Sequence, residues 1–187
     1  GVRILTVYAF STENLLRPSK EVQHLMHLFA ENFRKVGDDR RVHDNRIMVR
    51  VFGNRDLLPP EVLEAIEYAE ARTKDYDQYR FNLAVAYGGR EEILDAIRDV
   101  VRDAKDGKVR AEDINETFFS RRLYTADLPD PDLVLRTSGE ERISNFLLWQ
   151  LAYSELYFVD VYWPGFRKID FLRALRSYQM RQRRFGE

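Results

Sequence analysis

Two separate segments of the chain combine arginines with hydroxyl side chains, the residue types that bind phosphate groups. The first is Ser11-Thr-Glu-Asn-Leu-Leu-Arg17, and the second is Arg136-Thr-Ser-Gly-Glu-Glu-Arg142-Ile-Ser144. Arginine offers a rigid fork of donors for phosphate oxygens, while hydroxyls and backbone N–H groups near a helix start add further donors. The composition of both segments therefore suits an anion such as a diphosphate.

Each segment also has a purely structural explanation. The second could be a solvated loop whose arginines pair with Glu140 and Glu141, and the first could be a helix cap, because its residue types favour turns. Because the chain contains two such segments, two anion sites explain them better than a helix cap that happens to contain these residue types. For the second segment, composition alone leaves both explanations open.

Hydrophobic spacing predicts the elements that position these segments. We expect strands over 1–10, 47–52, 81–86, 133–135 and 156–161. We expect helices from Pro18 to Gly37, over 60–73, from Ile93 to Val101 and over 170–184, with one or two buried helical turns over 146–152 and a short helix within 112–130. This alternation predicts an α/β fold, a single domain over 1–187 with a mostly parallel central sheet flanked by helices.

Three polar clusters each follow a predicted strand. They are Ser11–Arg17, Tyr87–Arg90 and Arg136–Ser144. Ligands of parallel sheets bind beyond the carboxyl ends of the strands. We therefore expect the three clusters on one rim of the sheet.

Composition excludes several classes of protein. The chain has 187 residues, a net charge of -1 and no cysteine. The charge gives no general attraction for nucleic acid, so we expect no nucleic-acid partner. The absence of cysteine excludes disulfides and thiolate catalysis and fits the cytoplasmic location that we expect.

The motifs together resemble the cis-prenyltransferases, the family of undecaprenyl and dehydrodolichyl diphosphate synthases. The matching segments are Leu5–Asn14 with Arg17-Pro18, Asn82–Arg90, Asp132–Glu140, Arg142–Gln150 and Arg184–Gly186. They follow the family's order over essentially the whole chain. The resemblance implies the fold of that family and a transferase that condenses isopentenyl diphosphate with an allylic diphosphate such as farnesyl or geranylgeranyl diphosphate, with Mg²⁺ as cofactor.

The resemblance also implies roles for particular residues. Arg136, Arg142, Ile143 and Ser144 are expected to bind isopentenyl diphosphate, and Arg184 and Gly186 are expected to reach the same site from the partner subunit of a homodimer. The allylic side is expected to be lined by Ser11, Thr12, Glu13, Leu15 and Arg17.

Two further roles concern the proton and the metal. Asn14 matches the position assigned to proton removal, although an amide is a poor base and more plausibly orients an oxygen that takes the proton. Glu155 matches a carboxylate that helps to hold Mg²⁺. The growing hydrocarbon needs an apolar tunnel, and release of the product implies a peripheral contact with a membrane. The tunnel candidates are Ala9, Val22, Leu25, Met26, Phe29 and the helix around Ile93, although such a stripe is more often plain core.

The chain departs from the family's pattern in two places. Leu15 stands where the family has a tryptophan, and the family's first motif, a strand ending in Asp-Gly-Asn-Arg, has no match. We interpret the missing motif as truncation at the N-terminus rather than as an inactive relative. The alternative function is a non-catalytic accessory subunit of a heteromeric cis-prenyltransferase, which would lack the catalytic arginines.

Overall fold

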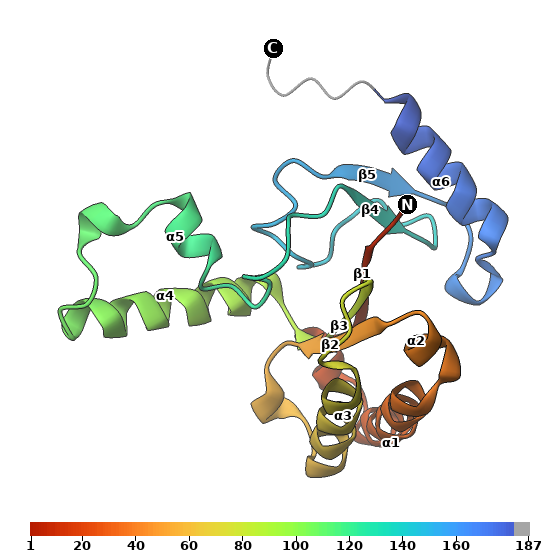
Figure 1. Cartoon of the computed structure of the whole chain (residues 1–187), viewed down its shortest axis with the longest axis horizontal. Helices are drawn as coiled ribbons and strands as arrows, with labels where there is room; N and C mark the ends of the chain where they lie inside the picture. Colours follow the sequence, from red (N-terminus) through yellow and green to blue (C-terminus); the bar gives the residue numbers. More distant parts are fainter. Residues whose placement is uncertain (182–187) are drawn as a thin grey trace. The chain divides into compact units, whose positions relative to one another are not determined.

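The computed structural model describes residues 1–181, and the chain divides into two compact units, residues 1–126 and residues 127–187. In the first unit, strands β1 (Ile4–Ser11), β2 (Ile47–Phe52) and β3 (Tyr79–Tyr87) form a parallel sheet in the order β1-β3-β2. In the second unit, β4 (Leu133–Arg136) pairs in parallel with β5 (Glu155–Phe158). The expected α/β fold with parallel strands is confirmed (Figure 1).

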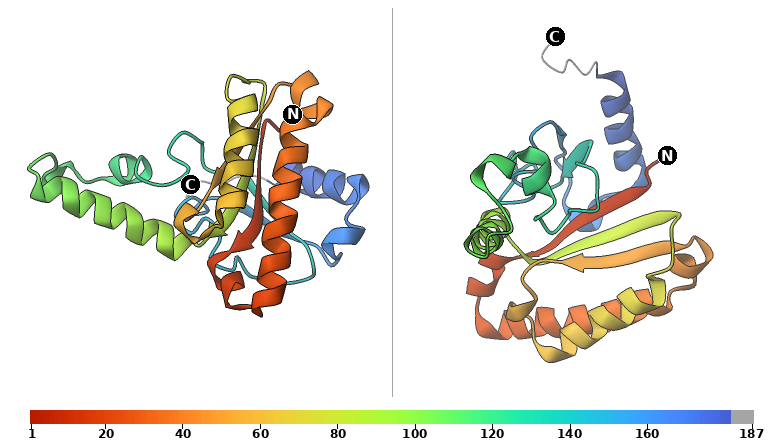
Figure 2. Two further views of the ribbon diagram at one scale, coloured as in Figure 1. Left: turned by 90° about the horizontal axis from the view of Figure 1, so that it is seen from below. Right: turned by 60° about the vertical axis from the view of Figure 1, so that its left-hand side comes forward.

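Two long helices cover one face of the three-stranded sheet. Helices α1 (Ser19–Asp38) and α3 (Pro60–Thr73) lie side by side against this face (Figure 2). Each begins directly after a proline, a residue suited to a helix start because its missing N–H has no partner there anyway. Their apolar faces enclose a buried core with the strands: Phe10, Met26, Ala30, Phe33, Val51, Leu58, Val62, Ala65, Ile66, Val85 and Ala86.

The residues expected to line a hydrocarbon tunnel belong largely to this core. Met26 is a buried member of it, and Ala9, Val22, Leu25 and Phe29 pack against it as partly buried side chains. Phe29 also makes an edge contact with the ring of Phe10, with centroids 5.8 Å apart. For these side chains the structure therefore shows core packing, which was the structural alternative to a tunnel.

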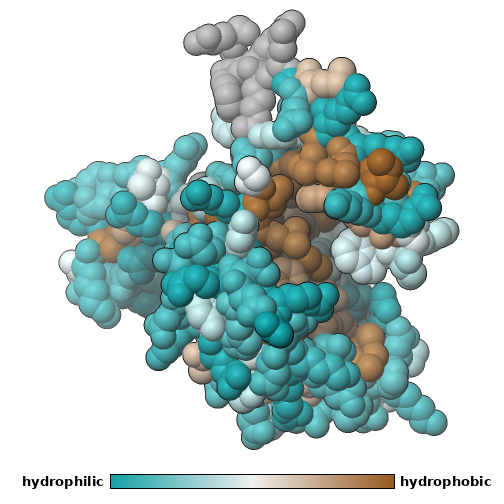
Figure 3. Space-filling view, turned by 45° about the vertical axis from the view of Figure 1, so that its right-hand side comes forward, coloured by the Kyte–Doolittle hydropathy of each residue, from teal (hydrophilic) through white to brown (hydrophobic). Residues whose placement is uncertain are grey.

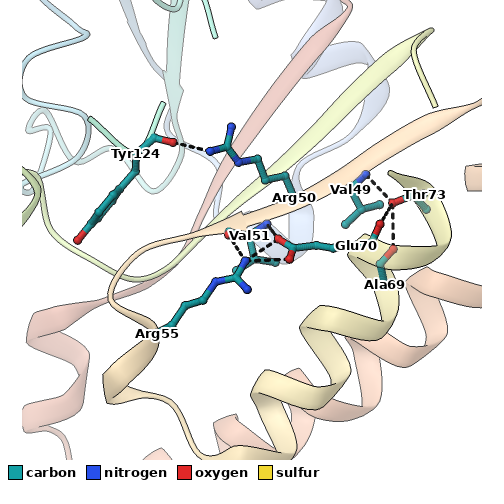
Figure 4. A network of polar contacts seen from close by, with 8 residues as sticks. All are labelled: Val49, Arg50, Val51, Arg55, Ala69, Glu70, Thr73 and Tyr124. Carbon is teal, nitrogen blue, oxygen red and sulfur yellow. Dashed lines mark hydrogen bonds and ion pairs between the residues drawn. The ribbon is translucent and has the colours of Figure 1, made fainter. Parts of the chain in front are cut away.

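The outer edge of β2 is satisfied by side chains of α3 rather than by another strand. The backbone N–H of Val49 donates to Thr73 Oγ1 at 3.0 Å, and the N–H of Val51 donates to Glu70 Oε1 at 2.8 Å (Figure 4). Arg55 donates to the same carboxylate at 2.7 and 2.8 Å. Because an unpaired strand edge can recruit another chain, these bonds protect the sheet from edge-to-edge association.

The remaining helices are α2 (Arg40–Asp44), α4 (Gly89–Lys105) and α5 (Glu116–Ser120) in the first unit, and α6 (Lys168–Met180) in the second. Short 3-10 helices cover Thr12–Leu16, Arg55–Leu57, Ala111–Asp113 and Trp163–Gly165. The sequence analysis missed α2 and the 3-10 helix over Thr12–Leu16. The short helix expected within 112–130 is present as α5.

Residues 146–152 contain one buried helical turn, closed by the bond from the Leu151 N–H to the Leu147 carbonyl oxygen at 3.0 Å. The positive φ angles of Ser144, Asn145 and Leu147 prevent a helix from starting earlier. Two expectations near the C-terminus need correction. The last strand is Glu155–Phe158 rather than 156–161. The last helix begins at Lys168 and ends at Met180, where 170–184 was expected, and residues 182–187 lie outside the described residues.

Within residues 1–181, the helices are all too short or too polar to cross a membrane.

Candidate functional site

The first candidate segment follows β1 directly and is organised by a reciprocal pair of hydrogen bonds. The N–H of Asn14 donates to Ser11 Oγ at 3.3 Å, and the N–H of Ser11 donates to Asn14 Oδ1 at 2.9 Å. This capping box starts the 3-10 helix over Thr12–Leu16. The helix-cap explanation is thus confirmed for Ser11 and Asn14, and it also decides which of their atoms remain available.

The capping box leaves an amide donor as the available group. The Oδ1 atom of Asn14 accepts from Ser11, so its NH₂ group is the part of the amide that can serve a ligand. The Ser11 hydroxyl accepts from Asn14 and is also hydrogen-bonded to the side chain of Tyr8. An amide donor directly after a strand suits an anion and does not suit a general base.

The other residues of this segment lie at the surface or half-buried. Arg17 donates to Glu21 Oε1 at 2.8 Å, with side chains 49% and 47% exposed. An exposed pair of this kind contributes at most about 1 kcal/mol, so a diphosphate can compete for the guanidinium. Thr12 Oγ1 donates to Glu13 Oε2 at 3.3 Å, and Leu15 packs against the buried core.

Backbone irregularities at the strand ends direct these side chains. The β1–β3 register shifts on both sides of Phe10, so that Tyr8 pairs with Ala84, Phe10 with Val85 and Ser11 with Tyr87. On β3 the skipped residue is Ala86, whose φ of 48° is uncommon for a residue with a side chain. Bulges and strained residues of this kind concentrate next to functional sites, where they re-aim side chains.

The second candidate segment brings its expected residues together. The Nη1 atom of Arg136, at the end of β4, donates to Ser144 Oγ at 2.7 Å and also to the carbonyl oxygen of Arg142. Ser138 and Gly139 between the two arginines, and Ser144 and Asn145 just after Arg142, have positive φ angles, so the backbone turns sharply at both places. The residues expected to bind isopentenyl diphosphate are therefore neighbours in space, with Ile143 half-buried between them.

The alternative of a solvated loop is partly realised. Arg142 forms an ion pair with Glu140, with side chains 63% and 43% exposed. Such exposed pairs contribute little to stability. Arg142 therefore remains able to exchange its carboxylate partner for a more highly charged phosphate group.

The candidate metal ligand lies at the start of β5. Glu155 Oε2 accepts from Arg181 Nη1 at 2.5 Å, and its side chain is 25% exposed. Among residues 1–181 there is no group of three His, Asp or Glu side chains placed to hold a metal ion. Mg²⁺ commonly uses one or two carboxylates together with substrate phosphates and water, so Glu155 fits as one ligand of such a site but does not complete it.

The Tyr87–Arg90 cluster is held by Glu92, which the sequence analysis did not single out as a candidate residue. Glu92, in the first turn of α4, is 1% exposed and accepts from Tyr87 Oη at 2.6 Å and from the N–H of Tyr124 at 2.8 Å. Tyr8 donates to the carbonyl oxygen of Tyr87 at 3.0 Å, and burial, helped by the charge of Glu13, raises the pKa of Tyr8 well above its usual range. Glu92 lies two residues after Arg90 in the sequence, but nothing there shows that it is buried.

The expected roles for Arg184 and Gly186 fall outside the described residues. Ser11–Arg17 and Tyr87–Arg90 belong to the first compact unit, and Arg136–Ser144 and Glu155 belong to the second. The expectation that all three clusters share one rim therefore stays a prediction.

Comparisons with known proteins agree over nearly the whole chain. The Prenyltransf family model, described as undecaprenyl diphosphate synthase, matches residues 1–186. A tritrans,polycis-undecaprenyl-diphosphate synthase (geranylgeranyl-diphosphate specific) of Pyrococcus abyssi is 58% identical over 186 residues, which cover 100% of this chain and 70% of the relative. A protein of the same name from Methanocaldococcus jannaschii is 53% identical over 189 residues, covering 100% of this chain and 68% of the relative.

Two solved structures share the fold. Lavandulyl diphosphate synthase from Lavandula x intermedia, in complex with dimethylallyl diphosphate, superimposes with a TM-score of 0.96 at 39% identity and covers 100% of this chain and 80% of that one. A probable undecaprenyl diphosphate synthase from Campylobacter jejuni gives a TM-score of 0.84 at 33% identity, covering 99% of this chain and 84% of that one.

Proposed function

The chain belongs to the undecaprenyl diphosphate synthase family of cis-prenyltransferases and elongates cis-prenyl chains, and we propose that its allylic substrate is geranylgeranyl diphosphate. The similar proteins of Pyrococcus abyssi and Methanocaldococcus jannaschii both carry this specificity in their names. The accessory-subunit alternative has no support among these relatives, which are named as synthases.

The arrangement around Arg136 is the observation that best supports binding of isopentenyl diphosphate. Its guanidinium already gathers the Ser144 hydroxyl and the backbone of Arg142 into one turn, whereas the Arg142 side chain exchanges Glu140 for the ligand. Residues that are already in place lose little conformational entropy when a ligand binds. We assign the diphosphate of isopentenyl diphosphate to Arg136, Arg142, Ile143 and Ser144.

The capping box after β1 supports an assignment of the allylic diphosphate to the first segment. Asn14 presents its NH₂ group beside Ser11, and Arg17 adds a positive charge held by an exposed ion pair. Thr12, Glu13 and Leu15 complete this proposed subsite. Leu15 contributes an apolar wall, since it packs against the core.

The chemistry follows from where charge develops. The bond between the allylic carbon and its diphosphate oxygen breaks, the double bond of isopentenyl diphosphate forms a new carbon–carbon bond there, and loss of one proton restores a double bond. Arginines placed at the leaving diphosphate stabilise its charge in the transition state. Because Asn14 Oδ1 is occupied, we assign Asn14 the role of orienting a phosphate oxygen that accepts the proton.

Magnesium is the proposed cofactor, with Glu155 as one protein ligand. When bound to a diphosphate, Mg²⁺ neutralises charge that builds up on the leaving group. Arg181 binds one of the two Glu155 oxygens at 2.5 Å and would compete with a bound ion for this carboxylate. That ion pair is partly exposed, so its replacement by a divalent ion is energetically accessible.

A homodimer is the proposed assembly, with Arg184 and Gly186 reaching the partner's site. The surface leading to this tail is apolar, because Trp163, Ile169, Leu172 and Met180 are 64%, 46%, 47% and 73% exposed. Figure 3 shows apolar side chains gathered on the exposed surface of the α6 segment. Exposed apolar residues that cluster in this way mark interaction surfaces. We also assign to this surface the peripheral membrane contact proposed for product release. A cytoplasmic location stays a prediction.

An incorporation assay tests the proposed substrates. Purified full-length protein with Mg²⁺ and radiolabelled isopentenyl diphosphate should extend geranylgeranyl diphosphate with a higher kcat/KM than farnesyl diphosphate. Equal or better use of farnesyl diphosphate would refute the assigned primer. Absence of incorporation with every allylic diphosphate would refute the activity itself.

A further inference from the structure

The most deeply buried carboxylate of the first unit has no role in the chemistry described above. Glu92 is 1% exposed, and the other buried residues of α4 are Gly89, Ala96 and Val100. Burial of a carboxylate costs several kcal/mol unless hydrogen bonds compensate for its lost hydration. Both Glu92 oxygens accept strong bonds, one from the Tyr87 phenol and one from the Tyr124 backbone N–H.

Tyr87 is the point at which several structural elements meet. It is fully buried, its carbonyl oxygen accepts from the Tyr8 phenol of β1, and its ring makes edge contacts with Tyr8, Phe52 and Tyr124 at 5.8, 5.3 and 6.3 Å. It also follows the strained Ala86 and opens the Tyr87–Arg90 cluster. The position of Tyr87 therefore constrains both the end of β1 and the start of α4.

The start of α4 depends on Tyr87 and Glu92 because its N-cap residue, Gly88, provides no side-chain hydrogen bond. The hydrogen bond from Tyr87 to Glu92, at 2.6 Å, joins the end of β3 to the first turn of α4 across this glycine. A polar pair of this kind specifies one arrangement where an apolar pair of equal volume would allow several.

We propose that Tyr87 and Glu92 form a positioning pair for the condensation reaction, which holds the Tyr87–Arg90 cluster and, through Tyr8, the strand that leads into Ser11–Arg17. The pair does not touch substrate itself. The proposal rests on the proposed function, because it supposes that Ser11–Arg17 binds the allylic diphosphate. Displacement of a binding group by about 1 Å can cost a hundredfold in rate, so loss of the pair should be visible in kinetics.

The first unit contains a matched control for this pair. Tyr124 Oη donates to Asp95 Oδ2 at 2.6 Å, which is also a bond from a tyrosine to a carboxylate on α4. Tyr124→Phe removes that phenol but retains the backbone N–H that binds Glu92. Asp95→Asn likewise matches Glu92→Gln as a change from acid to amide.

Steady-state kinetics of the full-length variants test the proposal. Tyr87→Phe and Glu92→Gln should each raise the KM for at least one of the two diphosphates about 10-fold or more, whereas Tyr124→Phe and Asp95→Asn should leave both KM values within about twofold. Partial unfolding would lower the apparent kcat and leave KM unchanged, so KM separates positioning from mere stability. Circular dichroism at the assay temperature selects variants that are folded, and Tyr87→Phe is the milder change if Glu92→Gln does not fold.

Unchanged KM values in folded Tyr87→Phe would overturn the proposal, as would equal increases in the control variants. These outcomes are independent of the proposed function, which is judged by incorporation with the unsubstituted protein. The double variant gives a further check. Because the two residues act as a unit, adding Glu92→Gln to Tyr87→Phe should raise KM much less than the product of the single effects, and a fully multiplicative increase would contradict a coupled pair.

Discussion

Single side chains in this protein are placed by bonds that leave only part of each functional group available. Asn14 uses its carbonyl oxygen to cap a turn and retains a donor, and Arg136 uses one nitrogen to join Ser144 to Arg142. In both cases the local backbone conformation sets the chemistry that the side chain can perform. Residue type alone already makes Asn14 a poor base, and the structure adds which of its atoms is bound within the chain.

The contribution of the second segment can be measured with Arg136→Ala and Arg142→Ala. Loss of a charge-assisted contact should cost about 1.5 to 3 kcal/mol, which corresponds to an approximately 10- to 150-fold fall in kcat/KM for isopentenyl diphosphate. Arg110→Ala is the control, because Arg110 is also exposed and paired with acidic side chains but lies in no candidate segment. Unchanged turnover and unchanged affinity in either test variant would remove that arginine from the site.

The role of Glu155 can be separated from a purely structural one through its dependence on the metal. Chelation of divalent ions should abolish turnover, and Glu155→Gln should raise the Mg²⁺ concentration needed for half-maximal activity, because an amide oxygen is a weaker ligand than a carboxylate. Arg181→Gln, which removes the competing partner of Glu155, should not raise it. The same Mg²⁺ dependence in Glu155→Gln and in the unsubstituted protein would argue against a ligand role.

At the level of elements, helices supply hydrogen-bond partners that the three-stranded sheet of the first unit lacks. Helix α3 satisfies N–H groups at the outer edge of β2 through Thr73 and Glu70, and α4 sends Glu92 back to the end of β3. Strand ends in this unit are therefore fixed by helix side chains in addition to the backbone ladder. Such reinforcement matters because the candidate residues follow directly after the strands.

The edge of β2 provides a prediction about stability. Thr73→Val conserves volume at a fully buried position but leaves the Val49 N–H without its acceptor, so the free energy of unfolding should fall by about 1 to 3 kcal/mol. Urea denaturation measures this change. Thr117→Val, at an exposed position in α5, should change stability by less than about 0.5 kcal/mol. Equal stability of Thr73→Val and the unsubstituted protein would show that the edge needs no cap.

At the level of the whole molecule, we propose that a second subunit completes the active site. In the sequence, the C-terminal Arg184 and Gly186 follow the exposed apolar residues Trp163, Ile169, Leu172 and Met180. An isolated basic tail would normally fray in water, whereas crossing a two-fold interface would give it a binding partner. A glycine near the end would let the backbone approach a bound diphosphate closely.

Complementation tests this shared site. Full-length Arg184→Ala and Arg136→Ala chains should each be about 10-fold or more less active at low isopentenyl diphosphate concentration, but a mixed dimer contains one site with both arginines intact. Activity of the mixture clearly above that of either variant is expected once subunits exchange. Absence of recovery, despite exchange demonstrated with differently tagged chains, would show that each subunit works with its own tail.

The sequence by itself determined the type of the main elements and the bounds of β2 and α3. Proline positions, apolar spacing and glycines predicted β2 and α3 at the observed residues, because these signals act within a few residues of the backbone. The motifs likewise selected Ser11–Arg17 and Arg136–Ser144, since the ability of arginine and hydroxyl groups to bind phosphate follows from the residue type. The family followed from the order of these motifs.

Only the tertiary structure decided how those residues are used. The turns at 146–152 and the register shifts around Phe10 depend on φ angles and pairing that residue types do not specify. The burial of Glu92 depends on Tyr87 and Tyr124, which lie 5 and 32 residues away along the chain. Its role is invisible in the sequence because a glutamate in the first turn of a helix is normally exposed, and only packing against distant residues makes it an internal anchor.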